Sequence, residues 1–370
     1  MGVILGFTGP IESLTPDMGG SAEVAFKEAS DSGLLLGGQK IVSVRADSTC
    51  IDNAAATAAA ERLVTAEKVA GIMGADCSGV TTAVANNVAV PNGVPMISPS
   101  ATSPALTTIA DNGYFFRTAP SDARQGQVLA SITVERGITS VAVTYVNSDY
   151  GKGLSDSFGK AFQALGGTVT ISVPHETGKA DYSAEVASMD SAGGDAMAVF
   201  GYVNQGGPGI MQASLDSGSF DKFILADGMY GDDLLTNVEG DLTGTFGTVP
   251  GTDSKGAATY ADMANAAGLK GSGPFTGESY DAAALLILAM QSAGSTDGAA
   301  IASNVMGVAN APGEKIMPGE LAKGLRILAN GGAVDYVGAT NVELTGVGEA
   351  SGSYREFEIR NKAFQTVRFR

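Results

Sequence analysis

Strand-like apolar runs alternate with helix-like segments along most of the chain, and this alternation limits the fold more than any other feature. The runs VILGFTG, KIVSVRA and VAGIMG are each followed by a helical pattern, at 19–32, 53–67 and 78–90. Each run is apolar throughout rather than at every second residue, which is typical of parallel strands covered on both faces. The pattern therefore predicts a doubly wound α/β fold.

The alternation occurs twice. After VPMIS and YFFRTAP close the first series, helical segments at 122–136, 151–165, 182–191 and 209–217 alternate with SVAVTYV, TVTISV, DAMAVFGY and KFILAD. A chain of 370 residues is also longer than the roughly 250 to 300 residues at which a single core stops growing. We therefore expect two lobes, each built on its own parallel sheet.

The last third of the chain predicts a return to both lobes. The chain is helical from about residue 252 through DAAALLILAM, and it ends in two antiparallel strands, YREFEIR and AFQTVRF, joined at Asn361 and Lys362. We expect residues 1–120 and about 251–335 to form the first lobe, and about 121–250 and 336–370 the second. Three crossings, near residues 120, 250 and 335, would join them.

Charge and hydropathy exclude several classes of partner. Lys and Arg number 22 against 39 Asp and Glu, a formal charge of −17, which repels nucleic acids and anionic membranes. The longest apolar run, AAALLILAM, is about half of the roughly 20 residues that cross a bilayer. MGVILGF leads directly into a strand, so we expect no signal peptide within this sequence.

Signals for catalysis are missing. The one histidine, His175 in VPHETGK, has no second histidine four residues on, and we expect it on an exposed loop. There is no nucleophile elbow and no phosphate-binding loop, and GYVNQGGPGI lacks the dinucleotide spacing. Two cysteines and one histidine cannot build the usual zinc site. We therefore expect no enzyme, no metal and no cofactor.

Polar side chains gather after the strands, where open α/β sheets bind ligands. In the first lobe these positions hold TGPIESL, ADCSG with Ser78, and SPSATS; in the second, Tyr150, Tyr202 and Asp227 follow successive strands. The cleft between the lobes is therefore the expected ligand site.

The hydroxyl run from Ser100 to Ser103 indicates an anion site. Its small side chains and backbone N–H groups can accept a carboxylate, and Ser78 at a helix start can add to it. The alternative is an ordinary helix cap and turn, which we favour for Ser103 before Pro104. Asp227 across the cleft would suit an ammonium group. Together these ends describe an α-amino acid, over which Tyr150 and Tyr202 could close.

Cys50 and Cys77 occupy similar positions, each after a strand-like run and before a helix-like one. If the two strands are neighbours in the sheet, the cysteines lie close enough for a disulfide. The residues alone leave this open, because two unrelated buried thiols give the same pattern.

GADCSGVTTAVANNVAVPNGVPMISPSATSPALT, NSDYGKGL and VILGFTGP resemble the type I periplasmic binding proteins of the leucine/isoleucine/valine-binding branch, the substrate-capturing subunits of ABC importers. The resemblance covers essentially the whole chain and is weak after about residue 252. It implies a periplasmic monomer whose two lobes close on a ligand and deliver it to a membrane permease. It also implies a disulfide between Cys50 and Cys77.

The resemblance also implies roles for single residues. The ligand carboxylate would lie on Ser78, Ala101 and Thr102, with Ser100 beside them, and its ammonium on Asp227. Tyr150 and Tyr202 match aromatic positions of the family's pocket.

Two positions depart from the family's pattern. Asp227 stands where Glu is frequent, so the ligand must sit deeper or a water must bridge. Leu14 stands where an aromatic residue often walls the side-chain pocket, which suits an aliphatic ligand. Glu12 or Asp17 would suit a cationic side chain if either pointed inward.

The expected function is therefore capture of an aliphatic, branched-chain type amino acid for import. A small amide or urea-like solute is the nearest alternative, because one fold serves many ligands. A ligand-sensing receptor domain is a second alternative, and a hydrolase is the least favoured.

Overall fold

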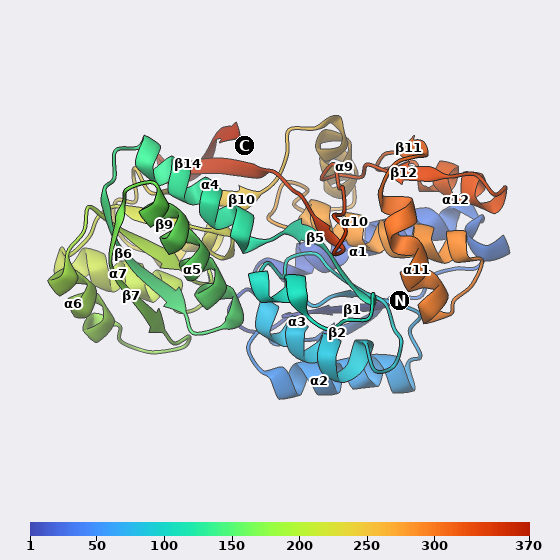
Figure 1. The fold of residues 1–370 in the computed structure, drawn as a ribbon, viewed down its shortest axis with the longest axis horizontal. Helices are drawn as coiled ribbons and strands as arrows, with labels where there is room; N and C mark the ends of the chain where they lie inside the picture. Colours follow the sequence, from blue (N-terminus) through green and yellow to red (C-terminus); the bar gives the residue numbers. More distant parts are fainter.

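The computed structural model describes all 370 residues and shows two α/β lobes side by side along the long axis of the molecule (Figure 1). The first lobe is built on a six-stranded, wholly parallel sheet. In spatial order its strands are β13 (Glu349–Ala350), β5 (Phe115–Pro120), β4 (Met96–Ser98), β3 (Ile72–Gly74), β1 (Gly2–Leu5) and β2 (Val44–Asp47). The predicted doubly wound fold is confirmed.

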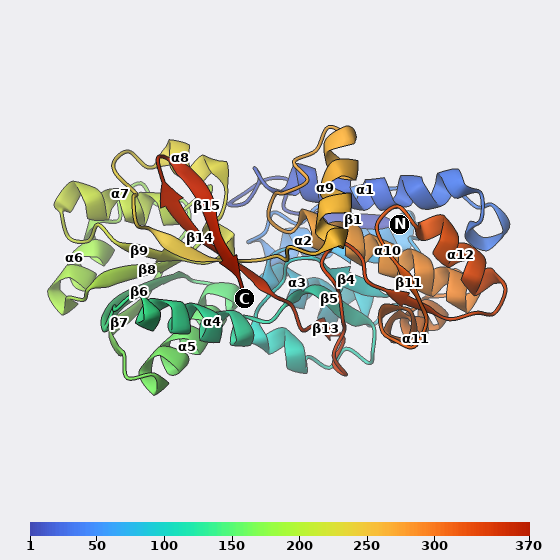
Figure 2. The same cartoon turned by 90° about the horizontal axis from the view of Figure 1, so that it is seen from above.

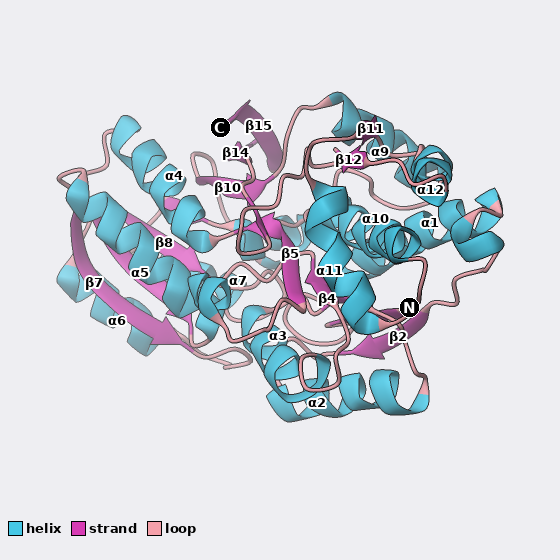
Figure 3. Ribbon diagram, turned by 45° about the vertical axis from the view of Figure 1, so that its right-hand side comes forward, coloured by secondary structure: helices cyan, strands magenta, loops and turns pink.

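Helices cover both faces of the first sheet (Figure 3). One face carries α2 (Asn53–Glu61) and α3 (Ser78–Val84), each extended by a π-helical turn, at Arg62–Ala66 and Ala85–Ala89. The other face carries α1 (Thr15–Ser32), α10 (Thr276–Ala293), α11 (Gly298–Ala309) and α12 (Leu321–Ala329), with α9 (Lys255–Ala266) beside α10. A two-stranded sheet, β11 (Glu314–Ile316) with β12 (Val334–Tyr336), completes this lobe. None of the helices combines the length and apolar character needed to span a bilayer.

The second lobe contains a seven-stranded sheet in which β14 alone runs opposite to the other strands, pairing antiparallel with β10 and β15. In spatial order its strands are β15 (Ala363–Phe369), β14 (Tyr354–Arg360), β10 (Phe246–Pro250), β9 (Phe223–Leu225), β8 (Ala196–Phe200), β6 (Ser140–Val146) and β7 (Thr168–His175). α4 (Asp122–Glu135) and α5 (Asp149–Ala164) pack on one face, and α6 (Ser183–Ala192) and α7 (Gly207–Ser217) on the other; α8 (Asp232–Asn237) follows β9.

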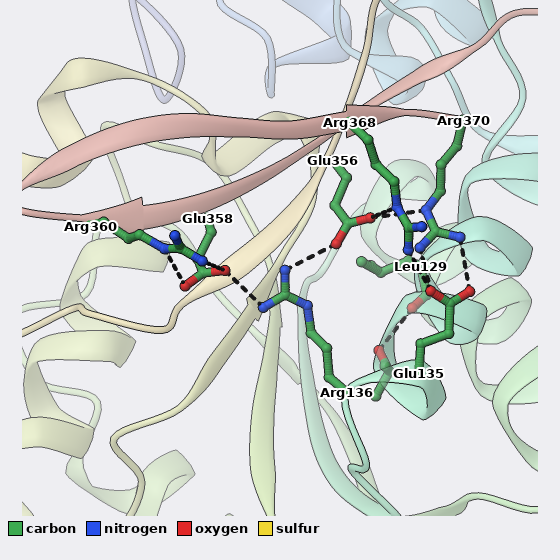
Figure 4. Close-up of polar contacts among 9 residues, drawn as sticks. Leu129, Glu135, Arg136, Glu356, Glu358, Arg360, Arg368 and Arg370 are labelled. Atoms are coloured by element: carbon green, nitrogen blue, oxygen red, sulfur yellow. Dashed lines mark hydrogen bonds and ion pairs between the residues drawn. The ribbon is translucent and has the colours of Figure 1, made fainter.

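The C-terminal hairpin has its turn where the sequence predicts it. Asn361 and Lys362 both have left-handed backbones, with φ of 52° and 55°, the conformation of a two-residue type I′ hairpin turn. The hairpin lies across the second lobe (Figure 2). An ion network ties it to the end of α4 through buried Glu356, which accepts hydrogen bonds from Arg136, Arg368 and Arg370 at 2.9–3.0 Å (Figure 4).

The chain crosses between the sheets three times. The first two crossings lie between β5 and α4 and between β10 and α9. The third lies between Ala350 and Tyr354, later than the expected position near residue 335, because the short β13 still adds to the first sheet. The crossings contact one another: the Gly251 N–H donates to the Ser353 carbonyl (3.0 Å), and the Tyr354 hydroxyl donates to the Ser121 carbonyl (3.3 Å).

Two further expectations have clear outcomes. Cys50 and Cys77 form a disulfide with a Cα–Cα distance of 5.1 Å, which confirms the bridge that the resemblance implies. The expectation of an exposed His175 is wrong: its side chain is 1% exposed at the end of β7, and Nδ1 pairs with the Thr144 hydroxyl at 2.9 Å. The His175 ring packs edge to face against Tyr182. The residues next to His175 in the sequence give no sign of this buried position.

Candidate ligand-binding site

A small cavity lies between the lobes at the carboxyl ends of both sheets. Its volume is about 30 Å³, room for only one or two waters, and all of its walls except Leu14 and Ser100 are buried. The lining residues are Ile11, Leu14, Met18, Asp76, Cys77, Ser78, Ser100, Tyr150, Tyr202, Asp227, Gly228 and Phe275. Six of the eight residues expected to bind ligand are thus brought together; Ala101 and Thr102 lie fully buried outside this lining.

The hydroxyl loop of the first lobe, residues 98–103, is held by its own hydrogen bonds. The Ser98 hydroxyl accepts the Ala101 N–H at 3.0 Å, and the Ser78 hydroxyl accepts the Ser103 N–H at 3.1 Å. The Ser100 hydroxyl donates to the Asp76 carbonyl at 3.2 Å. The loop is therefore set in one conformation before any ligand contributes, and its Ala101 amide is already occupied.

Thr102 keeps hydrogen-bonding capacity that the other loop residues have used. Its side-chain oxygen is completely buried and makes no hydrogen bond of good geometry, although it lies near enough to the Asp122 carboxylate to lower the pKa of that group; its N–H donates to no group of the protein. Because buried polar groups are almost always paired, a donor and a hydroxyl left over beside a cavity indicate a place for a polar ligand group.

Asp76 is a cavity residue that the sequence reasoning missed. Its carboxylate accepts the N–H of Gly6 (2.5 Å) and of Cys77 (2.9 Å) and the hydroxyl of Ser48 (2.9 Å). Burial raises the pKa of this carboxyl, and the donors from three loops hold it in place. Its surroundings indicate a structural brace for the strand ends rather than an open ligand contact.

Two stacked tyrosines and an acid form the wall of the second lobe. The rings of Tyr150 and Tyr202 lie 5.4 Å apart and nearly parallel, at 20°. The Tyr150 hydroxyl donates to a carboxylate oxygen of Asp227 at 3.3 Å and accepts the Gly228 N–H at 3.2 Å. Burial raises the pKa of Asp227 to about 6.

A second acid, Asp122, lies behind this wall at the start of α4. It is fully buried, and neither of its carboxylate oxygens has a hydrogen-bond partner. Burial, followed by the nearby charge of Asp227, raises the pKa of Asp122 well above its usual range. An unpaired carboxylate is costly in such a position and takes up a proton or a cation. In the sequence, Asp122 looks only like an ordinary acid at the start of a helix.

The remaining wall is apolar. Leu14 lies where expected, but Ile11, Met18 and Phe275 were not predicted. Phe275 has a left-handed backbone, with φ of 59°, a conformation that is rare for aromatic residues and concentrates at functional sites.

Neither Glu12 nor Asp17 belongs to the cavity. The Glu12 carboxylate accepts the Gly9 N–H, and the Asp17 carboxylate accepts the Lys270 N–H, each at 3.3 Å. Both acids thus hold backbone near the surface, and the apolar wall carries no acid for a cationic side chain.

Polar contacts join the lobes outside the lining of the cavity; we call these the rim contacts. Ser13 of the first lobe donates through its hydroxyl to the Asn204 side-chain oxygen at 2.9 Å, and the Asn204 amide donates to Asp233 at 2.6 Å. Lys270 pairs with Asp232 at 3.0 Å. The lobes are therefore held together by groups that do not line the cavity.

The chain matches the family model described as periplasmic binding protein over residues 1–321. A chemotactic signal transduction system substrate-binding protein, BasB, of Halobacterium salinarum is 26% identical over 99% of this chain and 88% of its own length. Leu/Ile/Val-binding protein homolog 1 of Brucella abortus is 30% identical over 80% of this chain and 79% of its own length.

Solved structures share the fold. The branched-chain amino acid transporter substrate-binding protein LivJ of Streptococcus pneumoniae, in complex with isoleucine, superposes with a TM-score of 0.80 at 22% identity, over 100% of this chain and 97% of that one. A solute-binding protein of an ABC transporter from R. palustris, in complex with 4-hydroxybenzoate, gives 0.77 at 19% identity, over 100% and 96%.

Fold, interlobe cavity and family model agree, and the chain belongs to the periplasmic binding protein family. It is a solute-binding protein rather than an enzyme, and it is related to Leu/Ile/Val-binding protein homolog 1.

Proposed function

We propose that this protein captures an α-amino acid with an aliphatic side chain outside the cytoplasm and delivers it to a membrane permease of an ABC importer. The amino acid would lie between the lobes, its carboxylate on the first and its ammonium on the second. Differential affinity for the closed form would drive closure.

The observation that carries this proposal is the pair of buried acids in the second lobe. Asp227 lines the cavity, and Asp122 beside it has two carboxylate oxygens with no partner. A ligand ammonium would balance the charge of one of these carboxylates while the other stays protonated, and it would donate hydrogen bonds to the pair. The Asp227 side chain is one methylene shorter than the Glu that is frequent at this position. With Asp122 beside it, the ammonium would have two carboxyl groups to bind instead of one.

The first lobe offers the complementary group. Ser78 stands at the start of α3, where the helix N-terminus favours an anion, and the unused N–H and hydroxyl of Thr102 are close behind it in the loop. We infer that these groups receive the carboxylate. Ala101 contributes backbone shape rather than a donor, since its N–H is already bonded to Ser98.

The apolar wall supports an aliphatic side chain. Ile11, Leu14, Met18 and Phe275 carry no charge and no hydrogen-bonding side-chain group. The cavity is too small for a ligand in this conformation, so the lobes must open by more than side-chain adjustment before an amino acid can enter.

A thermal-shift screen tests the proposal. Protein freed of ligand by unfolding and refolding is scanned against the common amino acids, 4-hydroxybenzoate and a set of small amides. A ligand at a hundred times its dissociation constant adds about 2.7 kcal/mol of stability. We expect an aliphatic amino acid to raise the melting temperature and Asp227→Asn to abolish the rise. If only an aromatic acid or an amide raises it, the amino-acid assignment is wrong and the two-lobe capture mechanism remains.

A sensory role is the second candidate, favoured by the similarity to the chemotactic BasB over nearly the full chain. Import and sensing use the same ligand site and differ in the membrane partner. Cross-linking of the ligand-bound protein in cells, followed by identification of the linked membrane protein, separates them: a permease supports import, and a receptor with a signalling domain supports sensing.

A further inference from the structure

Arg117 is a buried cation directly beneath the hydroxyl loop. It belongs to β5, and its side chain is 1% exposed, although charged groups are rarely so buried unless they are paired. We propose that Arg117 is a positioning residue that aims the Thr102 amide at the ligand carboxylate; this rests on the proposed function, in which the ligand carries a carboxylate at that loop.

The guanidinium holds the loop by two of its carbonyl groups. One terminal nitrogen donates to the carbonyl of Ala101 at 3.0 Å and to that of Ser103 at 2.8 Å. The carbonyl between them, on Thr102, accepts the N–H of Asp122 at 2.8 Å. Three successive carbonyls are thereby fixed, two of them by Arg117.

Fixing a carbonyl also fixes the N–H of the same peptide unit. The Ala101 carbonyl and the Thr102 N–H belong to one planar trans unit, in which they point in opposite directions. Because Arg117 binds the carbonyl, the N–H must point away from Arg117. This N–H has no partner within the protein, and the hydrogen bond to a cation at the carbonyl also makes the N–H a stronger donor.

Arg117 is held in turn by the last strand of the first lobe. Its second terminal nitrogen donates to the Glu349 carboxylate at 2.5 Å and to the Thr107 hydroxyl at 2.9 Å, and that hydroxyl donates to Glu349 at 2.8 Å. Glu349 lies in β13, one residue before the third crossing begins. The short strand β13 therefore supplies the counter-ion that keeps the guanidinium in its orientation.

The test uses Arg117→Lys and Glu349→Gln in the full chain. Lysine keeps the charge but cannot reach both carbonyls and Thr107 with one nitrogen. Affinity for L-leucine is measured by calorimetry, and the Thr102 amide is followed by NMR with ¹⁵N-threonine, assigned by Thr102→Ser. In the unmodified protein we expect L-leucine to move this amide resonance downfield. Arg117→Lys should weaken binding about tenfold or more and reduce the shift, and Glu349→Gln should do the same to a smaller extent.

Glu356→Gln is the matched control. It removes a buried carboxylate from the ion network of the second lobe, where Glu356 pairs with three arginines and makes no hydrogen bond to the hydroxyl loop (Figure 4). We expect this variant to lose stability while keeping the affinity for L-leucine and the Thr102 shift. Wild-type affinity and an unchanged shift in both Arg117→Lys and Glu349→Gln would overturn the inference; if Arg117→Lys does not fold, Glu349→Gln decides.

The ligand class is tested separately in the same experiment. If the unmodified protein ignores L-leucine but binds 4-hydroxybenzoate, the proposed amino-acid ligand fails, and the same variants test Arg117 with that carboxylate. If only an uncharged amide binds, and the Thr102 resonance does not move, the inference about Arg117 is wrong as well.

Discussion

The two walls of the cavity are built in opposite ways. On the first lobe, the hydroxyl loop is bonded to Ser78, Ser98 and Arg117, and a disulfide fixes the segment just before Ser78. On the second lobe, two acids share a buried position, and neither carboxylate oxygen of Asp122 makes a hydrogen bond of good geometry; the nearby Thr102 hydroxyl and Arg117 guanidinium offset its burial only in part. The first wall is held in one conformation without a ligand and leaves only Thr102 with spare hydrogen-bonding groups, whereas the second wall buries two acids that are poorly paired.

This difference suggests an order of events. A preformed wall loses little conformational freedom on binding and can receive the ligand while the lobes are apart. The second wall gains most from the ligand, because a ligand ammonium would pair with buried acids that otherwise lack good hydrogen bonds. The closed form would then be stabilised by the new contacts of the acids in the second lobe more than by contacts in the first lobe.

The largest effect should come from breaking the first wall. Replacing Cys50 and Cys77 with serine opens a loop of 27 residues, which costs about 3 to 4 kcal/mol on the chain-entropy model. Chemical denaturation measures this loss. The affinity of the folded variant for ligand should also fall, since Cys77 precedes Ser78; unchanged affinity would show that the wall does not need the bridge.

Removing the buried acid of the second wall should raise the stability of the ligand-free protein by about as much as the loss of the disulfide lowers it. A carboxyl whose pKa is raised in the folded state begins to destabilise the protein when the pH exceeds its pKa in the unfolded chain. The loss of stability is complete once the pH exceeds its pKa in the folded protein. With the pKa of Asp227 at about 6, Asp227→Asn should stabilise the ligand-free protein at pH 7 by up to about 3 kcal/mol.

The same substitution should abolish ligand binding. Denaturation at pH 4 and pH 7 separates the contributions, because the gain should largely vanish at pH 4. The exposed Asp221→Asn serves as a control and should change neither property. A ligand-free Asp227→Asn protein that is no more stable at pH 7 would contradict the view that the second wall stores unfavourable energy.

His175 provides a further test of the second wall, because its ring lies against Gly201 and Gly206 in the turn that carries Tyr202. Burial lowers the pKa of His175 to about 4. The folded protein therefore binds a proton later than the unfolded one, and stability should fall by about 3 kcal/mol as the pH drops from 6.5 to 4. His175→Gln should remove this part of the slope, and denaturation at several pH values gives the difference.

The smallest effect concerns the rim contacts, which touch neither wall. Asn204→Ala removes the hydrogen bonds to Ser13 and Asp233, and we expect a loss of about 1 kcal/mol, or several-fold in ligand affinity through faster dissociation. Lys270→Ala at the exposed pair with Asp232 should change less. Stopped-flow measurements follow both; an unchanged dissociation rate in Asn204→Ala would exclude the rim from holding the lobes closed.

Local patterns predict much of the fold and the polar half of the site. Buried strands, crossover helices and the residues after each strand follow from periodicity, so Ser78, Tyr150, Tyr202 and Asp227 could be placed at one cavity. β13 was missed because a strand of two residues is too short to show a hydrophobic pattern. Phe275 was missed because its position depends on a segment that returns from far along the chain.

The buried charges were harder to predict. Asp122 has the signature of an ordinary helix start, and only its surroundings in space make it unusual. Arg117 did leave a signal: YFFRTAP places a cation inside a strand that is otherwise apolar, which demands a buried partner. The partner, Glu349, lies more than two hundred residues away. The sequence therefore indicates that Arg117 needs an acidic partner but not which residue provides it.

The small size of the cavity has a consequence for timing. Since the cavity has room for only one or two waters and its walls are almost entirely buried, a solute enters or leaves only when the lobes move apart. The lifetime of the loaded state is then the waiting time for the three crossings to swing the lobes apart. A membrane partner that grips both lobes can govern unloading by mechanical means alone, without competing for a single atom of the cargo.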